Sequence, residues 1–151
     1  MRALDTERLE LRPMDERDEE LYCRIYTDAG LMRYVGERLA PDDALAAFGK
    51  VCRLNRDADF RYRCWVIRYR EGEQDIGLLA LMGSRKSAEI GAMLFAEWHG
   101  RGIAAEAINR LVDFAFGDHG VGDVYTRHRL ENELAQGLMR KLNFVLVSSE
   151  P

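Results

Sequence analysis

Four small residues stand at the start of an apolar helical pattern in the C-terminal half of the chain. Gly100, Gly102, Ala104 and Ala105 leave the backbone uncovered, and apolar residues recur at helical spacing over residues 103–115. The first N–H groups of a helix have no acceptor inside it and lie at the positive end of its dipole. These donors could hold a diphosphate, since each charge-assisted hydrogen bond contributes on the order of 1.5–3 kcal/mol. A tight strand-to-helix connection needs the same small residues, so this alternative stays open.

The two commonest nucleotide-binding motifs do not describe this segment. A P-loop requires Gly-Lys followed by Ser or Thr, and here Gly102 is followed by Ile103. A dinucleotide-binding fingerprint requires three glycines after the first strand of a βαβ unit, which is not the place of these residues. The segment therefore predicts an anion site of another kind.

Hydrophobic periodicity predicts the elements that must position this segment. Alternating or continuous apolar runs indicate strands, and apolar spacings of three and four indicate helices. The order of elements indicates an α/β, or α+β, layer architecture, with a central twisted sheet of about six strands, mixed parallel and antiparallel, and four flanking helices. The expected strands cover residues 8–12, 62–69, 76–82, 87–95, 122–128 and 144–147, and the expected helices cover residues 15–26, 41–52, 103–115 and 132–142.

Composition and charge restrict the class of protein. The 151 residues are 47% apolar and 32% charged, so we expect residues 1–151 to form a single globular domain. The formal net charge of −4 argues against a nucleic-acid partner, because phosphate binding needs excess positive charge. No apolar stretch approaches the roughly 20 residues of a membrane span, which favours a cytoplasmic protein without a membrane partner. Cys23, Cys52 and Cys64 lack CxxC spacing and are expected to be reduced and mostly buried.

Three segments of the chain resemble one enzyme family, the GNAT acyl-CoA N-acyltransferases. Residues 88–94 (AEIGAML) and 98–107 (WHGRGIAAEA) resemble its motif A, and residues 131–144 (ENELAQGLMRKLNF) resemble its motif B. The opening, residues 6–13 (TERLELRP), resembles the first strand of the branch that contains the ribosomal-protein N-terminal acetyltransferases. The resemblance covers nearly the whole chain and implies a GNAT-like fold. It further implies acetyl transfer from acetyl-CoA, without a metal, to a primary amine, either a protein N-terminal α-amine or a small amine.

The resemblance also implies which residues hold the cofactor. The strand residues Ala92, Met93 and Leu94 would pair with the pantetheine amides where their strand separates from the strand at residues 122–128. Asn132 would touch the pantetheine arm, although Asn also favours a helix N-cap and both roles can coexist. The diphosphate would lie against the loop and first helical turn formed by His99, Gly100, Arg101, Gly102, Ile103, Ala104 and Ala105.

The chemistry of acyl transfer requires a neutral amine, a stabilised oxyanion and a proton for the thiolate. The N–H of Leu94 could hold the oxyanion. Glu89 matches the position of a strand glutamate that acts as a base in some members, often through a water, and a solvated or cross-strand charge is the alternative for it. His128 has a pKa range suited to a base but also fits a structural histidine. His119 lies in a glycine-flanked turn and is expected to be exposed.

This chain departs from the family pattern in several places. His99 stands where Gln or Arg is usual, and Asn143 replaces a Gly that ends the motif B helix. Ala135 and Met139 occupy positions where a Ser or Tyr can protonate the thiolate, and neither side chain can donate a proton. A catalytically inactive domain that binds acyl-CoA for sensing or assembly is therefore the alternative function.

The C-terminus is expected to be short compared with the family. The chain ends seven residues after Phe144, where relatives continue into a further hairpin. The acceptor pocket would then be open on this side or completed by a neighbouring chain. Because residues 144–147 are expected to form a short apolar strand near the sheet margin, a homodimer is a further expectation.

Overall fold

Six strands form one sheet in which the spatial order follows the order in the sequence. The computed structural model describes residues 1–129 and 131–146, and within them the strands pair antiparallel from β1 to β5, whereas β5 and β6 pair parallel. The predicted mixed sheet of an α/β protein is confirmed. The strands are β1 (Leu4–Asp5), β2 (Leu9–Pro13), β3 (Tyr62–Tyr69), β4 (Gln74–Gly83), β5 (Ser87–Leu94) and β6 (Asp123–Tyr125).

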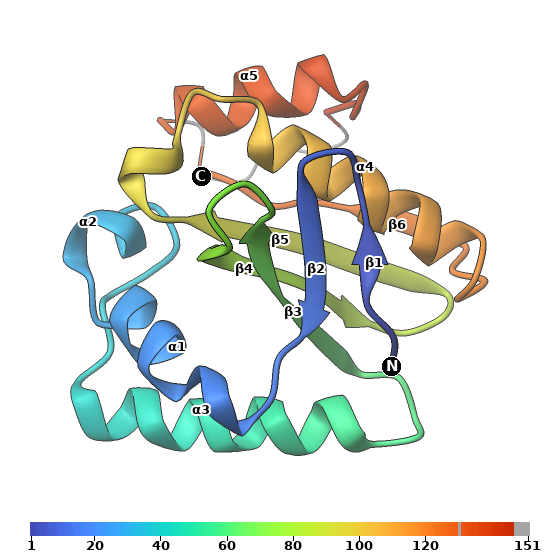
Figure 1. Cartoon of the computed structure of the whole chain (residues 1–151). Helices are drawn as coiled ribbons and strands as arrows, with labels where there is room; N and C mark the ends of the chain where they lie inside the picture. The colour runs from blue at the N-terminus through green and yellow to red at the C-terminus, as the bar shows by residue number, and fades with distance from the viewer. Residues whose placement is uncertain (130, 147–151) are drawn as a thin grey trace.

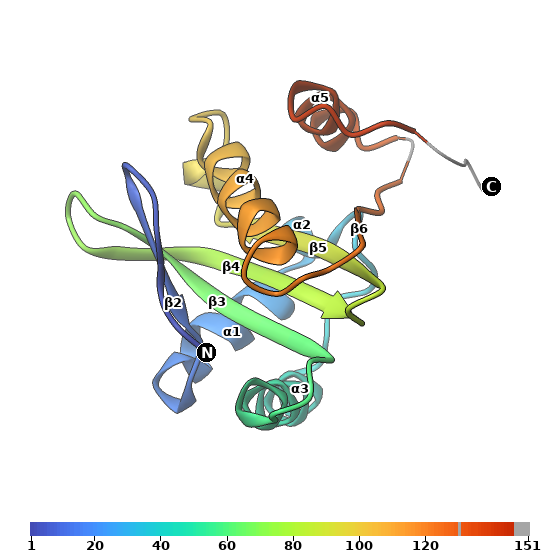
Figure 2. The same ribbon diagram turned by 90° about the vertical axis from the view of Figure 1, so that its right-hand side faces the viewer.

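Helices cover both faces of this sheet. The long helix α4 lies on one face, α1 and α3 lie on the other, and α5 lies on the α4 side beyond β6 (Figures 1 and 2). Two short 3₁₀ turns are present: η1 (Glu16–Asp18) precedes α1, and η2 (Ala96–Trp98) precedes residues 99–102, here called the glycine loop. The α-helices are α1 (Glu19–Tyr26), α2 (Ala29–Met32), α3 (Pro41–Arg56), α4 (Ile103–Phe116) and α5 (Glu133–Lys141).

Each face of the sheet has its own hydrophobic cluster. Residues of β5 contribute to both clusters, on opposite faces: Ala88, Ile90 and Leu94 pack with α4, while Met93 packs with α1 and α3. The apolar stripe predicted for α4 is buried, with Leu111 among the fully buried side chains. The sheet and α4 therefore form a rigid base on which the β5–α4 connection is held.

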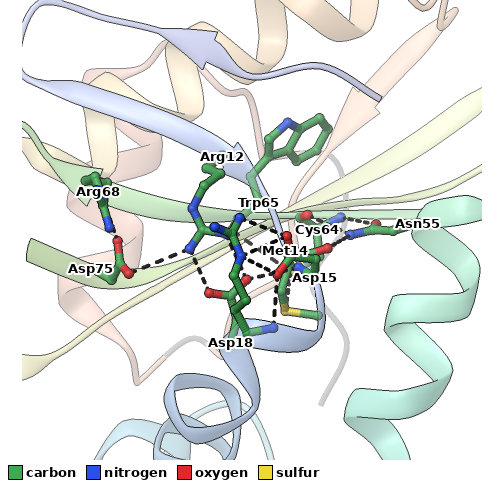
Figure 3. Close-up of polar contacts among 10 residues, drawn as sticks. Arg12, Met14, Asp15, Asp18, Asn55, Cys64, Trp65, Arg68 and Asp75 are labelled. Carbon is green, nitrogen blue, oxygen red and sulfur yellow. Dashed lines mark hydrogen bonds and ion pairs between the residues drawn. The ribbon is translucent and has the colours of Figure 1, made fainter.

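A polar cluster fixes the start of α1 to the sheet (Figure 3). Arg12 on β2 donates two hydrogen bonds to Asp18, at 3.0 and 2.7 Å, and Asp18 also accepts from the backbone N–H of Asp15 at 2.9 Å. Asp75 on β4 lies 3.6 Å from Arg12 and accepts from Arg68 at 2.9 Å. Only 4% of Asp18 is exposed. The hydrogen bonds from these donors compensate for the water that its buried carboxylate has lost.

The predicted elements differ from the structure at residues 144–146 and in two short elements. Residues 144–146 form no strand, and Val147 lies outside the described residues. A strand needs a neighbour to complete its ladder, and here Val145 and Leu146 are instead 81% and 69% exposed. The reason for expecting a homodimer therefore falls away. The strands and helices that periodicity missed, β1 and α2, are only two and four residues long and carry too little pattern to detect.

Of three further local predictions, two are confirmed and one is wrong. Asn143 has a φ of 64° directly after α5, as expected for a residue that replaces glycine at a left-handed helix end. The three cysteines are free, and two of them are buried. The predicted exposure of His119 was wrong, because its ring packs edge-on to Phe60 at 4.5 Å and stacks on Phe114 at 5.3 Å.

Candidate functional site

The strands β5 and β6 pair only at their beginnings. The parallel register runs from Ser87↔Asp123 to Glu89↔Tyr125, and β5 then continues for five residues to Leu94 without a β6 partner in the described part of the chain. The N–H of Phe95 donates to Ile76 on β4 at 3.0 Å. Because successive peptide groups of a strand point to opposite edges, the N–H and C=O of Leu94 and Ala92 point to the other, unpaired edge. An extended chain with amide groups could pair with this edge.

The unpaired edge leads into the uncapped N-terminus of α4. Gly100 and Gly102 have φ angles of 77° and 75°, a region that favours glycine, and Gly102 is the N-cap residue. Within the described residues no side chain caps this helix start. The guanidinium of Arg101 lies 4.7 Å from the centre of the Trp98 ring, which keeps a cation beside the loop. Uncapped N–H donors, the helix dipole and this cation together favour an anion at this position.

The turn between β1 and β2 supports this loop (Figure 1). The Arg8 guanidinium donates to the carbonyl of Arg101 at 2.9 Å and to Glu106, in the first turn of α4, at 2.7 Å. Glu106 also accepts from the backbone N–H of Arg8 at 2.9 Å and from the Thr6 hydroxyl. Burial by itself would raise the pKa of Glu106, but the hydrogen bonds from Thr6 and Arg8 outweigh it and lower that pKa. Glu106 is therefore a carboxylate that faces the β1–β2 turn.

His99 closes the other side of the loop. Its Nε2 lies 3.0 Å from the carbonyl oxygen of Leu94, and since a carbonyl only accepts, Nε2 carries the proton in this contact. The histidine thus ties the loop to the end of β5. His99 stands where the resembling family has Gln or Arg, and in this chain its ring hydrogen-bonds the end of β5. Any contact of His99 with a cofactor stays a prediction.

Glu89 lies at the last residue pair before β5 and β6 separate. Its carboxylate is 3.7 Å from Nε of Arg127, an ion pair in which the arginine side chain is 76% exposed. Five residues of extended strand separate Glu89 from Leu94, roughly 16 Å between Cα atoms, and roughly 10 Å separate it from Ala92. A base at Glu89 would reach an amine beside Leu94 only through water, as the sequence argument supposed. The cross-strand charge and the base remain compatible.

Asn132, Ala135 and Met139 belong to α5 and its N-cap. The side chain of Asn132 accepts from the N–H of Ala135 at 3.1 Å, so its role as an N-cap is confirmed, and its contact with pantetheine stays a prediction. Sequence reasoning missed Thr126, which follows β6 and donates its hydroxyl to the sulfur of Met139 at 3.1 Å. A hydroxyl therefore lies beside the position at which the family can have a proton donor.

A cavity of about 360 Å³ opens next to the end of β5. It lies between α1, α2 and the loop that follows β5, and Arg24, Asp28, Phe95, Glu97 and His99 are among its lining residues. Arg24 stacks over the Phe95 ring at 4.1 Å. The cavity belongs to the size class of small-molecule sites. Of the residues that connect α1 to α3, Asp28, Gly30 and Leu31 line the cavity.

The part of the chain that the structure describes shows neither a metal-binding cluster nor a membrane-spanning helix. Over residues 1–129 and 131–146, no group of three or more His, Cys, Asp or Glu side chains is placed to hold a metal ion. None of the helices in this part of the chain has both the length and the apolar character needed to cross a membrane.

Known proteins share this sequence pattern and architecture. The family described as "Acetyltransferase (GNAT) domain" matches residues 8–145. Two curated relatives are named uncharacterized N-acetyltransferases: p20 of Bacillus licheniformis is 25% identical, covering 95% of this chain and 83% of the relative, and YoaA of Bacillus subtilis (strain 168) is 27% identical, covering 93% and 81%.

Solved structures extend the likeness to the fold. The spermidine N-acetyltransferase from Vibrio cholerae, in complex with CoA and spermine, has a TM-score of 0.78 at 23% identity over 91% of this chain and 81% of that one. An acetyltransferase from Salmonella typhimurium that modifies the N-terminal serine of ribosomal protein L7/L12 has a TM-score of 0.77 at 17% identity, over 91% and 81%.

Proposed function

Because this chain belongs to the GNAT family and is an acetyltransferase, we propose that it transfers the acetyl group of acetyl-CoA to a primary amine by direct attack in a ternary complex. The acceptor is a protein N-terminal α-amine or a small amine. The reaction takes place within one domain, residues 1–151, in the cytoplasm.

One observation carries this proposal: the unpaired edge of β5 leads directly into the uncapped start of α4. The edge and the helix start fit the two chemically different parts of CoA, an extended chain with two amides and a diphosphate. Ala92 and the N–H of Leu94 point to the unpaired edge and offer strand pairing to the pantetheine, and Asn132 contacts it from α5. Met93, which was also expected to pair with it, has its N–H and C=O directed to β4. The diphosphate lies against His99, Gly100, Arg101, Gly102, Ile103, Ala104 and Ala105.

Acetyl-CoA supplies the activated thioester, and the protein supplies position and charge. The N–H of Leu94 points to the unpaired edge and stabilises negative charge on the reacting carbonyl oxygen. Glu89 removes a proton from the acceptor ammonium group through water. An α-amine with a pKa of about 7.7–8.0 is already neutral in roughly a tenth of molecules at pH 7, so it demands much less of such a base than a lysine does. A protein N-terminus therefore suits a distant base.

The cavity beside His99 is the proposed acceptor site. It carries the carboxylates of Asp28 and Glu97, which favour a cationic amine, and it adjoins the end of β5 at Leu94. The solved neighbours support both acceptor classes, since one is named a spermidine acetyltransferase and another modifies a ribosomal protein N-terminus.

Binding and turnover test this function separately. Isothermal titration with acetyl-CoA should give a dissociation constant in the micromolar range, and the absence of both heat and a Tm shift would remove the proposal. Release of CoA thiol should then be followed across diamines, polyamines and peptides with free or blocked N-termini. Blocking the N-terminus should abolish turnover of a peptide acceptor.

Ala135 and Met139 motivate a second candidate, an inactive domain that binds acyl-CoA. Neither residue can protonate the thiolate, although a thiol of pKa about 8.5 leaves without much help. Tight binding of acetyl-CoA with no thiol release for any acceptor would favour this candidate over the enzyme.

A further inference from the structure

Arg8 joins two structures that meet only in the folded chain. It follows Thr6 in the turn between β1 and β2, and its guanidinium reaches both the glycine loop and the first turn of α4, more than 90 residues later. Its Nε donates to Glu106, and its Nη1 donates to the carbonyl of Arg101. The two bonds use opposite sides of one planar group, so they fix the loop and the helix relative to each other.

The bond to Arg101 has a consequence for the next peptide N–H. In a planar trans peptide, the C=O of one residue and the N–H of the following residue point in opposite directions. When Arg8 holds the carbonyl of Arg101 at 2.9 Å, the N–H of Gly102 must point away from Arg8. A Cβ on Gly102 would lie 3.5 Å from the Arg8 guanidinium, which shows how closely the side chain approaches the loop backbone.

The bond to Glu106 has an electrostatic consequence. A carboxylate in the first turn of a helix competes with any anion for the positive end of the dipole. Here both carboxylate oxygens are occupied, one by the Arg8 guanidinium and the other by the Arg8 backbone N–H and the Thr6 hydroxyl. The side chain of Glu106 is 20% exposed, so its charge is balanced inside a partly desolvated site.

We propose that Arg8 is the positioning residue of the diphosphate site: it aims the N–H of Gly102 at the anion and neutralises Glu106, which would otherwise repel it. This inference rests on the proposed function, because it concerns the same cofactor. Arg8 itself does not touch the diphosphate; it acts through the loop and through Glu106.

Four variants separate the two roles. Arg8→Met keeps much of the side-chain length and removes both bonds, and Arg8→Lys keeps the charge but cannot hold two acceptors in the same fork. Glu106→Gln removes the carboxylate, alone or combined with Arg8→Met. Arg70→Met is the matched control, since Arg70 also contacts the β1–β2 turn, at Thr6 and Asp5, but within the described structure makes no bond to α4.

The measurement compares ligands that contain or lack the diphosphate. Arg8→Met should weaken CoA and dephospho-CoA, which keeps the diphosphate, by the same factor, about ten- to a hundredfold. The affinity for pantetheine, followed by NMR titration, should stay unchanged, and Arg70→Met should bind all three ligands as the unaltered protein does. The affinity of Arg8→Lys for CoA should lie between that of Arg8→Met and that of the unaltered protein. Adding Glu106→Gln to Arg8→Met should restore part of the CoA affinity.

Each failure has a distinct signature. If the unaltered protein does not bind CoA, the proposed function fails. If it binds CoA and Arg8→Met binds CoA equally well, only the role of Arg8 is overturned. An equal loss for pantetheine and CoA would also overturn it, because that pattern indicates a general disturbance of the fold.

Discussion

Two arginines four residues apart, Arg8 and Arg12, each pair with a carboxylate at the start of a helix. Arg12 pairs with Asp18 at the N-cap of α1, where the surrounding donors complete a closed cluster and the carboxylate is 4% exposed (Figure 3). Arg8 pairs with Glu106 in α4, where both side chains are partly exposed and the neighbouring helix N–H groups are uncapped. The closed polar cluster stabilises the fold, whereas the cluster beside the uncapped donors belongs to the proposed diphosphate site.

The largest expected effect lies in the closed cluster. Arg12→Met should lower the free energy of unfolding by about 3–5 kcal/mol, because it leaves the carboxylate of Asp18 buried and deprived of its cation. Urea denaturation measures this loss, and Asp18→Asn in the same background should recover part of it. Arg17→Met is the control: its ion pair with Asp15 is exposed and should change stability by about 0–1 kcal/mol. An equal loss in both variants would erase the distinction between closed and open clusters.

Neighbouring peptide groups at the end of β5 give the second test. Proline at residue 94 removes an N–H that points to the unpaired edge, so Leu94→Pro should reduce kcat about 10²- to 10³-fold while the sheet ladder persists. Phe95→Pro instead removes the hydrogen bond to Ile76 and should mainly reduce the Tm. Circular dichroism and initial rates distinguish the two. A Leu94→Pro protein that folds and retains full kcat would show that this amide has no catalytic role.

Glu89 offers a third, smaller effect on catalysis. Glu89→Gln keeps the shape of the side chain but removes the base, so kcat should fall about a hundredfold with unchanged affinity for acetyl-CoA. Arg127→Met, which removes the exposed ion pair at 3.7 Å and the cation–π contact with Tyr125 at 5.6 Å, should change kcat severalfold at most. Rates at saturating acetyl-CoA and titration of both variants are the measurements. Equal rates for Glu89→Gln and the unaltered protein would leave Glu89 as a cross-strand charge.

The smallest expected effect concerns His119, whose ring packs against Phe60 and Phe114. Burial, together with the charges of Arg85 and Arg63, lowers the pKa of His119, and within the described residues its Nε2 has no hydrogen-bond partner. The unfolded chain therefore takes up a proton first, so stability should be full above about pH 6.5 and decline as the pH falls below it. Tm measured from pH 7.5 to pH 5 should show this decline, and His119→Phe should reduce it. An unchanged slope in this variant would assign the decline to other groups.

Local sequence patterns were sufficient for most elements of the molecule. β3 matches its predicted range and β5 ends one residue early, while α4 begins at the predicted residue because the glycines before Ile103 interrupt regular structure. The strand prediction failed over residues 144–146 because so few apolar residues are equally compatible with an exposed segment. The extent of β6 was overestimated for a related reason, since a strand ends where its neighbour diverges and not where its apolar character ends.

The sequence by itself determined which peptide groups lack side chains over them, which helix follows them, and which family the motifs resemble. These properties depend on residues close together in the chain, whose types set the local backbone conformation. Only the tertiary structure decided that β5 and β6 separate after Glu89, that His99 meets the Leu94 carbonyl, and that Arg8 reaches Glu106. Such contacts follow from the register and twist of the sheet, which bring distant segments together and which no local pattern encodes.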